Sequence, residues 1–402
     1  MYRLETQGKD KKPIYFILFL FSLVIGSKWN IPVGVALKPY MFLIVGYLFI
    51  NFRKFNIYKP QLFEVILFIF YAIYSITGIF SKYPNLAMRG ILATIILFIL
   101  YVCMKDSLSK LSLNSIGYGI SVVGLIFNIG SLLYYVMGIL NINNDFHGND
   151  IAHFGIVLDR NMGRLIGLTN DPNLFAFFNL LFLCYYIMNT KIIRNKIGLL
   201  LSITTTLLTF SRGALVSVLL IILLSVLLKE NRGKIKLILG LITIYIISSL
   251  FISQFTGISL EEMIIERFST FYEDRGSGRL DLWEQGIQLF KENPLIGIGS
   301  YNFSMYHLFL YGNQMYVHNT FLEVLSETGI LGTFFYVLSI LVLLFKSIII
   351  VIKNKKAAFL FLTLVGYLSM MFTLSLVLSE IFICFLVIFF RYYEELQEVN
   401  DA

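Results

Sequence analysis

The chain reads GSGRLDLWEQGIQLFKENPLIGIG from Gly276 to Gly299 and HNTFLEVLSETGILGT from His318 to Thr333. These two runs gather arginine, aspartate, tryptophan and histidine between long apolar stretches. Ionisable residues are costly to hold at the depth of a membrane, so where they occur among apolar spans they mark functional sites. We therefore expect the chemistry of this protein to lie in these two runs.

The composition is that of an integral membrane protein. Of the 402 residues, 57% are hydrophobic and only 14% are charged, whereas a soluble domain carries about 25% charged residues. Apolar runs of about 20 residues, the length that crosses a bilayer, recur along the whole chain. We predict an all-α polytopic membrane protein that forms a single integral membrane domain over residues 1–402. The three cysteines lie inside apolar runs, and their spacing indicates neither a disulfide nor a metal site.

Hydropathy predicts about twelve transmembrane helices. They lie near residues 13–28, 32–50, 61–80, 88–104, 115–140, 170–190, 197–211, 213–228, 235–255, 318–350, 357–377 and 378–392. Lysine and arginine gather in the loops that this order places on the side of both termini, so we expect the N- and C-termini to be cytoplasmic. The net charge of +8 is explained by these topology signals, and we predict no nucleic-acid partner.

Two polar segments then lie on the opposite, extracytoplasmic side. The first extracytoplasmic loop covers residues 141–169, and the large one covers residues 256–317. Within the large loop, apolar residues recur at helical spacing over 259–272 and again over 280–292. We expect two short amphipathic helices there, lying at the membrane interface.

Three arginines are placed near the outer membrane boundary: Arg164, Arg212 and Arg279. A guanidinium group is always charged and offers a planar fork of donors that suits a phosphate. If the fold brings the three together, they would hold a pyrophosphate leaving group. The alternative is that each arginine only extends to lipid head groups.

His318 stands at the outer end of a long predicted span, and Glu323 and Glu327 follow on one helix face. A histidine that titrates near neutral pH can accept a proton from a sugar hydroxyl, although a histidine at a helix start is often structural. Aromatic residues nearby would stack on sugar rings or form an interfacial belt; they are Trp283, Tyr301, Tyr306, Tyr311 and Tyr316. His147 and His153 have acidic neighbours but no recognised ligand spacing, so we predict no metal.

These motifs resemble those of the O-antigen ligase and polymerase family, the membrane transferases of bacterial surface polysaccharides. The resemblance covers residues 164–333. It is carried most specifically by His318-Asn319 followed after nine residues by Gly329, and then by Gly332-Thr333. The other shared pieces are Arg164 with Leu168, Ser211-Arg212-Gly213-Ala214, Gly278-Arg279-Leu280-Asp281-Leu282-Trp283 and Asn293-Pro294-Leu295-Ile296-Gly297-Ile298-Gly299.

The resemblance implies a metal-independent, inverting glycosyltransferase with a GT-C-like fold, no cofactor, and a site on the outer face of the bacterial cytoplasmic membrane. It implies a glycan donor on undecaprenyl pyrophosphate, a glycan or lipid-linked acceptor, and chain-length regulator and flippase proteins as partners. His318 would be catalytic. Arg164, Arg279 and, less directly, Arg212 would bind the pyrophosphate. The residues expected to support the site or bind the acceptor are Asn319, Glu323, Asp281 and Trp283.

The motifs leave three functions open. We favour a repeat-unit polymerase of capsule, exopolysaccharide or O-antigen synthesis, because a chain rich in Ile, Lys, Asn and Phe is typical of AT-rich genomes, which include many bacteria without lipid A. The first alternative is a ligase that attaches the glycan to lipid A-core. The second is a transporter or flippase of lipid-linked oligosaccharide, which the sequence disfavours because the spans carry few charges and show no repeat.

Overall fold

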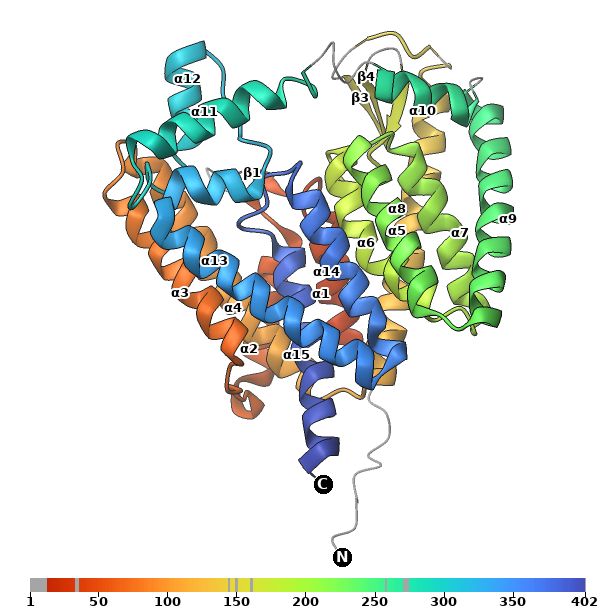
Figure 1. The fold of residues 1–402 in the computed structure, drawn as a ribbon, viewed down its shortest axis with the longest axis horizontal. Coiled ribbons are helices and arrows are strands. Elements are labelled where there is room, and N and C mark those ends of the chain that lie inside the picture. Colours follow the sequence, from red (N-terminus) through yellow and green to blue (C-terminus); the bar gives the residue numbers. More distant parts are fainter. Residues whose placement is uncertain are drawn as a thin grey trace, which may run out of the picture.

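The computed structural model describes residues 13–32, 36–143, 145–148, 151–159, 162–256, 259–269 and 275–401. A helix lies in each of the twelve ranges where the sequence predicts a span (Figure 1). These helices are α1 (Ile14–Ile25), α2 (Pro39–Asn51), α3 (Leu62–Ile79), α4 (Pro84–Ser109), α5 (Leu113–Asn141), α6 (Pro172–Met188), α7 (Ile193–Leu208), α8 (Arg212–Leu228), α9 (Asn231–Thr256), α13 (Thr320–Lys353), α14 (Ala358–Met371) and α15 (Glu380–Asp401).

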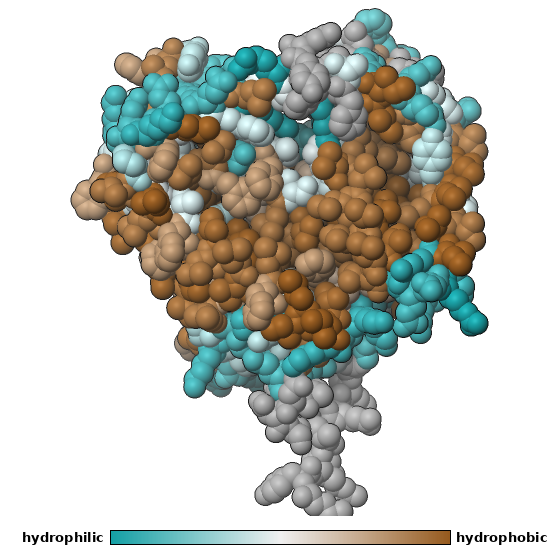
Figure 2. Space-filling view, in the orientation of Figure 1, coloured by the Kyte–Doolittle hydropathy of each residue, from teal (hydrophilic) through white to brown (hydrophobic). Residues whose placement is uncertain are grey.

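The molecular surface carries a broad hydrophobic belt. Figure 2 shows this belt between hydrophilic surfaces above and below it, as expected for a protein that sits in a bilayer. Among the described helices, α3, α4, α5, α9 and α13 are long and apolar enough to cross a membrane, while α1, α6 and α8 are apolar but shorter. The prediction of a polytopic helical membrane protein is confirmed in this coarse form, and the count of twelve spans stays a prediction.

The two polar ends of the bundle differ in structure. One end, here called the loop side, carries the short helices α10 (Leu260–Ser269), α11 (Arg279–Glu292) and α12 (Phe303–Tyr311) (Figure 1). Helices α10 and α11 correspond to the two amphipathic helices expected in the large loop, and α12 is an addition to them. The C-terminal ends of α2 and α15 lie at the other end, here called the basic side. Near this end, the Lys105 ammonium group lies over the ring of Phe390 and donates a hydrogen bond to the backbone carbonyl of Lys59.

The all-α prediction needs one correction, because the described chain also contains two small antiparallel sheets. Strands β1 (Ile31–Pro32) and β2 (Ala36–Leu37) form a two-stranded pair. Strands β3 (Ile151–His153), β4 (Ile156–Asp159) and β5 (Met162–Leu165) form a three-stranded sheet within the first predicted loop. Each strand has only two to four residues, which is too short for a period-two pattern to stand out in the sequence.

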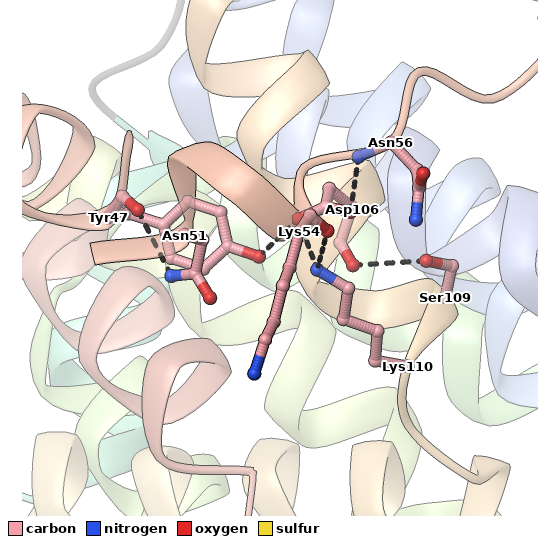
Figure 3. Close-up of polar contacts among 7 residues, drawn as sticks. All are labelled: Tyr47, Asn51, Lys54, Asn56, Asp106, Ser109 and Lys110. Atoms are coloured by element: carbon pink, nitrogen blue, oxygen red, sulfur yellow. Dashed lines mark hydrogen bonds and ion pairs between the residues drawn. The ribbon is translucent and has the colours of Figure 1, made fainter. Parts of the chain in front are cut away.

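A buried carboxylate fixes the basic side of α2 and α4 (Figure 3). Asp106 on α4 is 0% exposed. It accepts hydrogen bonds from the Tyr47 hydroxyl (2.7 Å) and the Asn56 backbone N–H (3.1 Å), and it forms an ion pair with Lys110 (2.6 Å). A buried charge is tolerated only when it is paired and hydrogen-bonded, so this cluster locks the α2–α3 loop onto the end of α4.

Helix α13 is broken at Gly329, and the motif loop after α11 fills the break. Gly329 has φ 61° and ψ −161°, a conformation that is essentially restricted to glycine. The Ile298 and Gly299 N–H groups donate to the carbonyls of Ser326 and Glu327, both at 2.9 Å. In return the Ile330 N–H donates to Pro294 O (2.9 Å) and the Leu331 N–H to Leu295 O (3.3 Å). We call this pairing the loop clamp; it supplies partners for backbone groups that a broken span would otherwise leave unsatisfied.

Candidate functional site

Three helices begin around one large cavity on the loop side. The cavity has a volume of about 890 Å³ and is here called the arginine cavity. The N-terminal ends of α6, α8 and α11 all contribute to its wall. Its polar and charged lining residues are Asp159, Arg164, Asn170, Asp171, Asn173, Arg212, Ser277, Arg279, Ser369 and Thr373. All three arginines singled out from the sequence therefore face one space.

Strand β5 positions Arg164. Its Nε donates to the Thr209 carbonyl (2.9 Å), and its Nη1 donates to the Asp159 carboxylate (2.8 Å). Thr209 lies in the turn between α7 and α8, so this arginine also ties the sheet of the first loop to the α7–α8 hairpin. The guanidinium is mostly buried, with 13% of the side chain exposed.

Arg212 is the first residue of α8, directly after a strained turn. Phe210 has φ 47°, and the Ser211 side chain caps the helix by accepting the Ala214 N–H. The Ser211 hydroxyl also donates to Asn173 on α6 at 2.7 Å. The hydrogen bond joins the starts of α6 and α8, so the N-terminal dipole ends of both helices point into the arginine cavity.

Arg279 begins α11 after four consecutive residues with left-handed backbone. These are Arg275 (φ 46°), Gly276 (φ 68°), Ser277 (φ 64°) and Gly278 (φ 75°). The turn delivers the guanidinium at the N-terminus of α11, which itself favours an anion. One turn further along α11, Trp283 lines the same cavity. Its indole Nε1 is buried without a hydrogen-bond partner among the described residues.

A second cavity adjoins the first and contains the predicted catalytic histidine. It has a volume of about 370 Å³ and is here called the histidine cavity. Asn170, Asp171 and Asn173 line both cavities. The remaining polar lining of the histidine cavity consists of Ser27, Lys38, Tyr74, Tyr301, Tyr316, His318, Glu323, Ser375, Ser379 and Glu380. The two spaces therefore share the wall formed by the start of α6.

His318 lies just before α13 in a left-handed conformation, with φ 51°. Its backbone N–H donates to the Ser375 hydroxyl at 3.1 Å. Burial lowers the pKa of its imidazole, the positive charge of Arg279 lowers it further, and Asp171 opposes both effects. The net result is a pKa below the usual 6.5, so the neutral, proton-accepting form is favoured at physiological pH. The dependence on Arg279 also places the imidazole within electrostatic reach of the arginine cavity.

The two glutamates of α13 have different surroundings. Glu327 accepts the Tyr74 hydroxyl (2.9 Å) and the backbone N–H groups of Tyr301 (2.8 Å) and Phe303 (3.1 Å), so it holds the start of α12. Glu323 lines the histidine cavity, and its Oε2 is buried with no hydrogen-bond partner in the part of the chain that is described. Of the two, Glu323 is the one available to a ligand.

Two other expected site residues lie elsewhere. The Asn319 side chain caps α13 by accepting the N–H groups of Phe321 (3.0 Å) and Leu322 (3.2 Å). Asp281 is 62% exposed and forms an ion pair with Arg275 at 2.8 Å. Neither residue is among those that line the two cavities, so any effect of theirs on binding would pass through the positions of His318 and Arg279.

The aromatic residues of the large loop divide into two groups. Tyr301 and Tyr316 line the histidine cavity, whereas Tyr306 packs edge-on against Tyr83 and Tyr311 is 66% exposed. In the first loop, the His147 imidazole contacts the neighbouring Asp145 carboxylate at 2.6 Å. Among the described residues, no group of three or more His, Cys, Asp or Glu side chains is arranged to hold a metal ion.

Sequence reasoning did not identify several lining residues. Asp171 and Asn173 stand at the start of α6, where the Asp171 side chain caps the helix by accepting the N–H groups of Asn173 and Leu174. The Asp-Pro pair is a recognisable helix start, but this signal indicates a cap and says nothing about a cavity. Lys38 and Glu380 come from helices at opposite ends of the chain, and no local signal in the sequence relates them.

Comparisons with known proteins agree with the motifs. Residues 197–337 match the family model described as O-antigen ligase. A segment is 34% identical over 67 residues to the exopolysaccharide production protein ExoQ of Rhizobium meliloti (strain 1021), and it covers 14% of this chain and 15% of that protein. The resemblance to the O-antigen ligase and polymerase family is confirmed. Arg212, Arg279 and His318 lie within the residues that match the family model.

Proposed function

We propose that this protein transfers a glycan from undecaprenyl pyrophosphate to the hydroxyl group of an acceptor sugar, on the extracytoplasmic face of the cytoplasmic membrane. The single observation that carries this proposal is the common wall between the two cavities. One cavity holds three arginines and the other holds a histidine that favours its neutral form. A charged leaving group and a hydroxyl nucleophile need these two environments side by side.

The arginine cavity would hold the pyrophosphate. Arg164, Arg212 and Arg279 approach it from a strand and two helix starts, and two aspartates, Asp159 and Asp171, offset part of their charge. As the bond between the sugar C1 and the phosphate oxygen breaks, negative charge develops on the pyrophosphate. Fixed guanidinium groups and helix N-termini stabilise that charge without reorganising. This supply of positive charge from the protein is our reason for proposing a metal-independent reaction.

The histidine cavity would hold the acceptor. The acceptor oxygen forms the new bond to C1, its proton passes to His318, and undecaprenyl pyrophosphate leaves with the bonding electrons. Asn170, Asp171 and Asn173 line both cavities, so the two spaces meet there, and we propose that the acceptor attacks C1 at this junction from the face opposite the leaving group. We therefore propose a single displacement with inversion at C1.

Substitution of His318 and Arg279 tests this proposal. The host strain lacking the gene supplies a lipid extract that contains unreacted lipid-linked glycan, and this extract serves as substrate for the purified protein in vesicles. We expect Arg279→Ala and His318→Ala each to lower the transfer rate by about 100-fold or more. Arg53→Ala and His147→Ala are matched controls at exposed positions outside both cavities, and they should retain the rate. Full activity of either cavity variant, or loss of activity on adding a chelator of divalent metals, would contradict the respective part of the proposal.

Between the two acceptor classes we propose the polymerase. The composition argument points to hosts without lipid A, and the matched relative is named an exopolysaccharide production protein. The ligase alternative is favoured by the description of the family model, O-antigen ligase. Analysis of the product decides between them: a polymerase extends lipid-linked glycan to multiples of one repeat, and a ligase makes a product only when lipid A-core is added.

The transporter alternative predicts movement of lipid-linked glycan across the vesicle membrane without any new glycosidic bond. Charged residues buried near the basic side of the described spans are paired within the fold; Lys105, for example, contacts Glu64 at 2.9 Å, with both side chains almost fully buried. Such pairs have no partner to exchange with a moving substrate, which disfavours transport. Flipping without product formation in the same vesicles would favour it.

A further inference from the structure

The histidine cavity contains buried polar atoms that the protein leaves without partners. Glu323 is 8% exposed, and its Oε2 has no hydrogen-bond partner among the described residues. The hydroxyl group of Ser27, which follows α1 near the N-terminal end of the sequence, is also buried and without a hydrogen-bond partner within the described ranges. A buried polar atom without a partner is unfavourable. Both line the same cavity, so a ligand that brings hydroxyl groups would satisfy both at once.

An ion pair completes the wall. Lys38, just before α2, contacts the carboxylate of Glu380, the first residue of α15, and the side chains are 27% and 19% exposed. The Tyr40 hydroxyl also donates to Glu380 at 3.3 Å. Lys38 and Glu380 both lie outside residues 197–337, the segment that matches the family model. The histidine cavity is thus built partly from the matched segment and partly from residues outside it.

The charge of this cavity is opposite to that of its neighbour. Among its described lining residues, Asp171 and Glu380 supply two carboxylates against the ammonium group of Lys38, and Glu323 adds a buried carboxyl group that can accept or donate a hydrogen bond. No arginine is among the lining residues that the structure describes. A ligand group with negative charge would meet these carboxylates at short range in a partly buried space, where like charges repel strongly. Neutral hydroxyl groups would instead donate hydrogen bonds to the carboxylates and accept hydrogen bonds from Lys38.

We propose that the histidine cavity is a subsite for the terminal sugar of the acceptor, and that it selects an uncharged sugar through hydroxyl contacts with Glu323, Ser27 and the Lys38–Glu380 pair. This inference rests on the proposed transferase function and specifies its acceptor class. The volume of about 370 Å³ lies at the lower end of small-molecule sites, which suits one terminal sugar and not a whole repeat unit. Lys38 and Glu380 thereby become determinants of acceptor specificity.

The first experiment changes only the acceptor and needs no variant. The acceptor probe is the oligosaccharide released from the host polymer by partial acid hydrolysis. Its derivative, oxidised at primary hydroxyls to carboxylates, is the charged counterpart. In vesicles with the wild-type protein and lipid-linked glycan from the deletion strain, we expect kcat/KM to be at least tenfold lower for the oxidised probe. Equal use of the two probes, or a natural acceptor that ends in a uronic acid, would overturn the proposal.

The second experiment tests the named residues. The double variant Lys38→Met/Glu380→Gln removes both charges together, so neither partner is left uncompensated. We expect its KM for the neutral oligosaccharide to rise at least tenfold, while undecaprenyl pyrophosphate still raises its melting temperature as in the wild type. We expect Glu323→Gln to reduce the ratio of kcat/KM for the neutral probe to kcat/KM for the oxidised probe. The matched control is Lys355→Met/Glu230→Gln, which removes an exposed ion pair (3.3 Å) on the basic side and should leave KM unchanged.

The outcomes separate this inference from the proposed function. If Arg279→Ala and His318→Ala abolish transfer but the double variant keeps the wild-type KM, the acceptor subsite lies elsewhere and the transferase stands. If both single variants retain transfer, the proposed function itself fails. A double variant that no longer folds is recognised by the loss of its melting transition, and the two acceptor probes on the wild-type protein then decide.

Discussion

The loop clamp makes a sharp prediction about Gly329. A Cβ atom at this position would lie 2.5 Å from both the carbonyl carbon and the carbonyl oxygen of Leu295. Both are backbone atoms, so no side-chain rotation relieves the clash. The φ of 61° also strains any residue other than glycine. We therefore expect Gly329→Ala to displace the segment 294–299 from the break in α13.

The cost can be summed from the contacts that would be lost. The backbone strain is about 1–3 kcal/mol. The four hydrogen bonds of the loop clamp contribute about 0.5–1.5 kcal/mol each when they are lost. Partial retention of the clamp reduces the sum, and we expect a destabilisation of about 3 kcal/mol or more. Because Tyr301 follows the clamp and lines the histidine cavity, transfer activity should also fall, with a larger effect on the acceptor KM than on donor binding.

The assay is thermal unfolding of the purified protein in detergent, with transfer measured on the same samples. Gly46→Ala in α2 is the matched control, since a Cβ there meets no atom within 4 Å and alanine is the better helix former by about 1 kcal/mol. We expect Gly46→Ala to melt at or slightly above the wild-type temperature and Gly329→Ala well below it. The reasoning is refuted if the two variants have the same melting temperature.

Three further predictions concern other parts of the molecule. Burial and Arg279 keep the pKa of His318 below 6.5, against the effect of Asp171, so the neutral imidazole is the main form above pH 6.5. We therefore expect kcat/KM to rise with pH along one limb, with an apparent pKa below 6.5, and to stay level up to pH 8. A decline of kcat/KM over pH 6–8 would argue against His318 as the base. Asp106→Ala should destabilise the protein by about 3 kcal/mol, because the Tyr47 hydroxyl and the Lys110 ammonium group lose their shared partner. An unchanged melting temperature in detergent would contradict the role assigned to Asp106. Asn128→Leu should lower stability by about 1 kcal/mol, since Asn128 donates to Asn179 at 2.9 Å in the buried interior, and an increase in melting temperature would show that this pair contributes nothing.

Much of the fold follows from sequence because each signal is local. The helix in each predicted range depends on apolar runs, and the amphipathic helices α10 and α11 depend on spacing within one or two turns. The break of α13 at Gly329 could not be predicted from the sequence. The motif glycines are visible there, but the segment 294–299 that fills the break lies 30 or more residues earlier, and no local pattern relates the two segments. The sheet β3–β5 was missed because its strands are shorter than the pattern that identifies a strand.

The candidate site was harder to predict because it depends on distances between remote segments. The sequence places Arg164 and Arg279 near the same membrane boundary, but only the resemblance suggests that they meet, since 114 residues lie between them. Lys38 and Glu380 are 342 residues apart, and each alone is an ordinary charged residue at the start of a helix. Asp281 shows the opposite case: it stands in a conspicuous motif, yet its side chain contacts Arg275 at the surface. A motif identifies a segment, and only the tertiary structure decides which of its side chains face a ligand.

The charges of the two cavities follow from which residue begins each helix. Helices α8 and α11 begin with arginine, at Arg212 and Arg279, so their positive dipole ends and the guanidinium groups add together and favour an anion. At the histidine cavity, α15 begins with Glu380, and the start of α6, which lines both cavities, is capped by Asp171, so these carboxylates compensate the dipole ends. Helix ends are also the places in a membrane bundle where backbone groups lack intrahelical partners and can reach water. A charge-separated reaction can therefore be placed between two sets of helix starts, with the leaving group at the basic set and a neutral nucleophile at the acidic one.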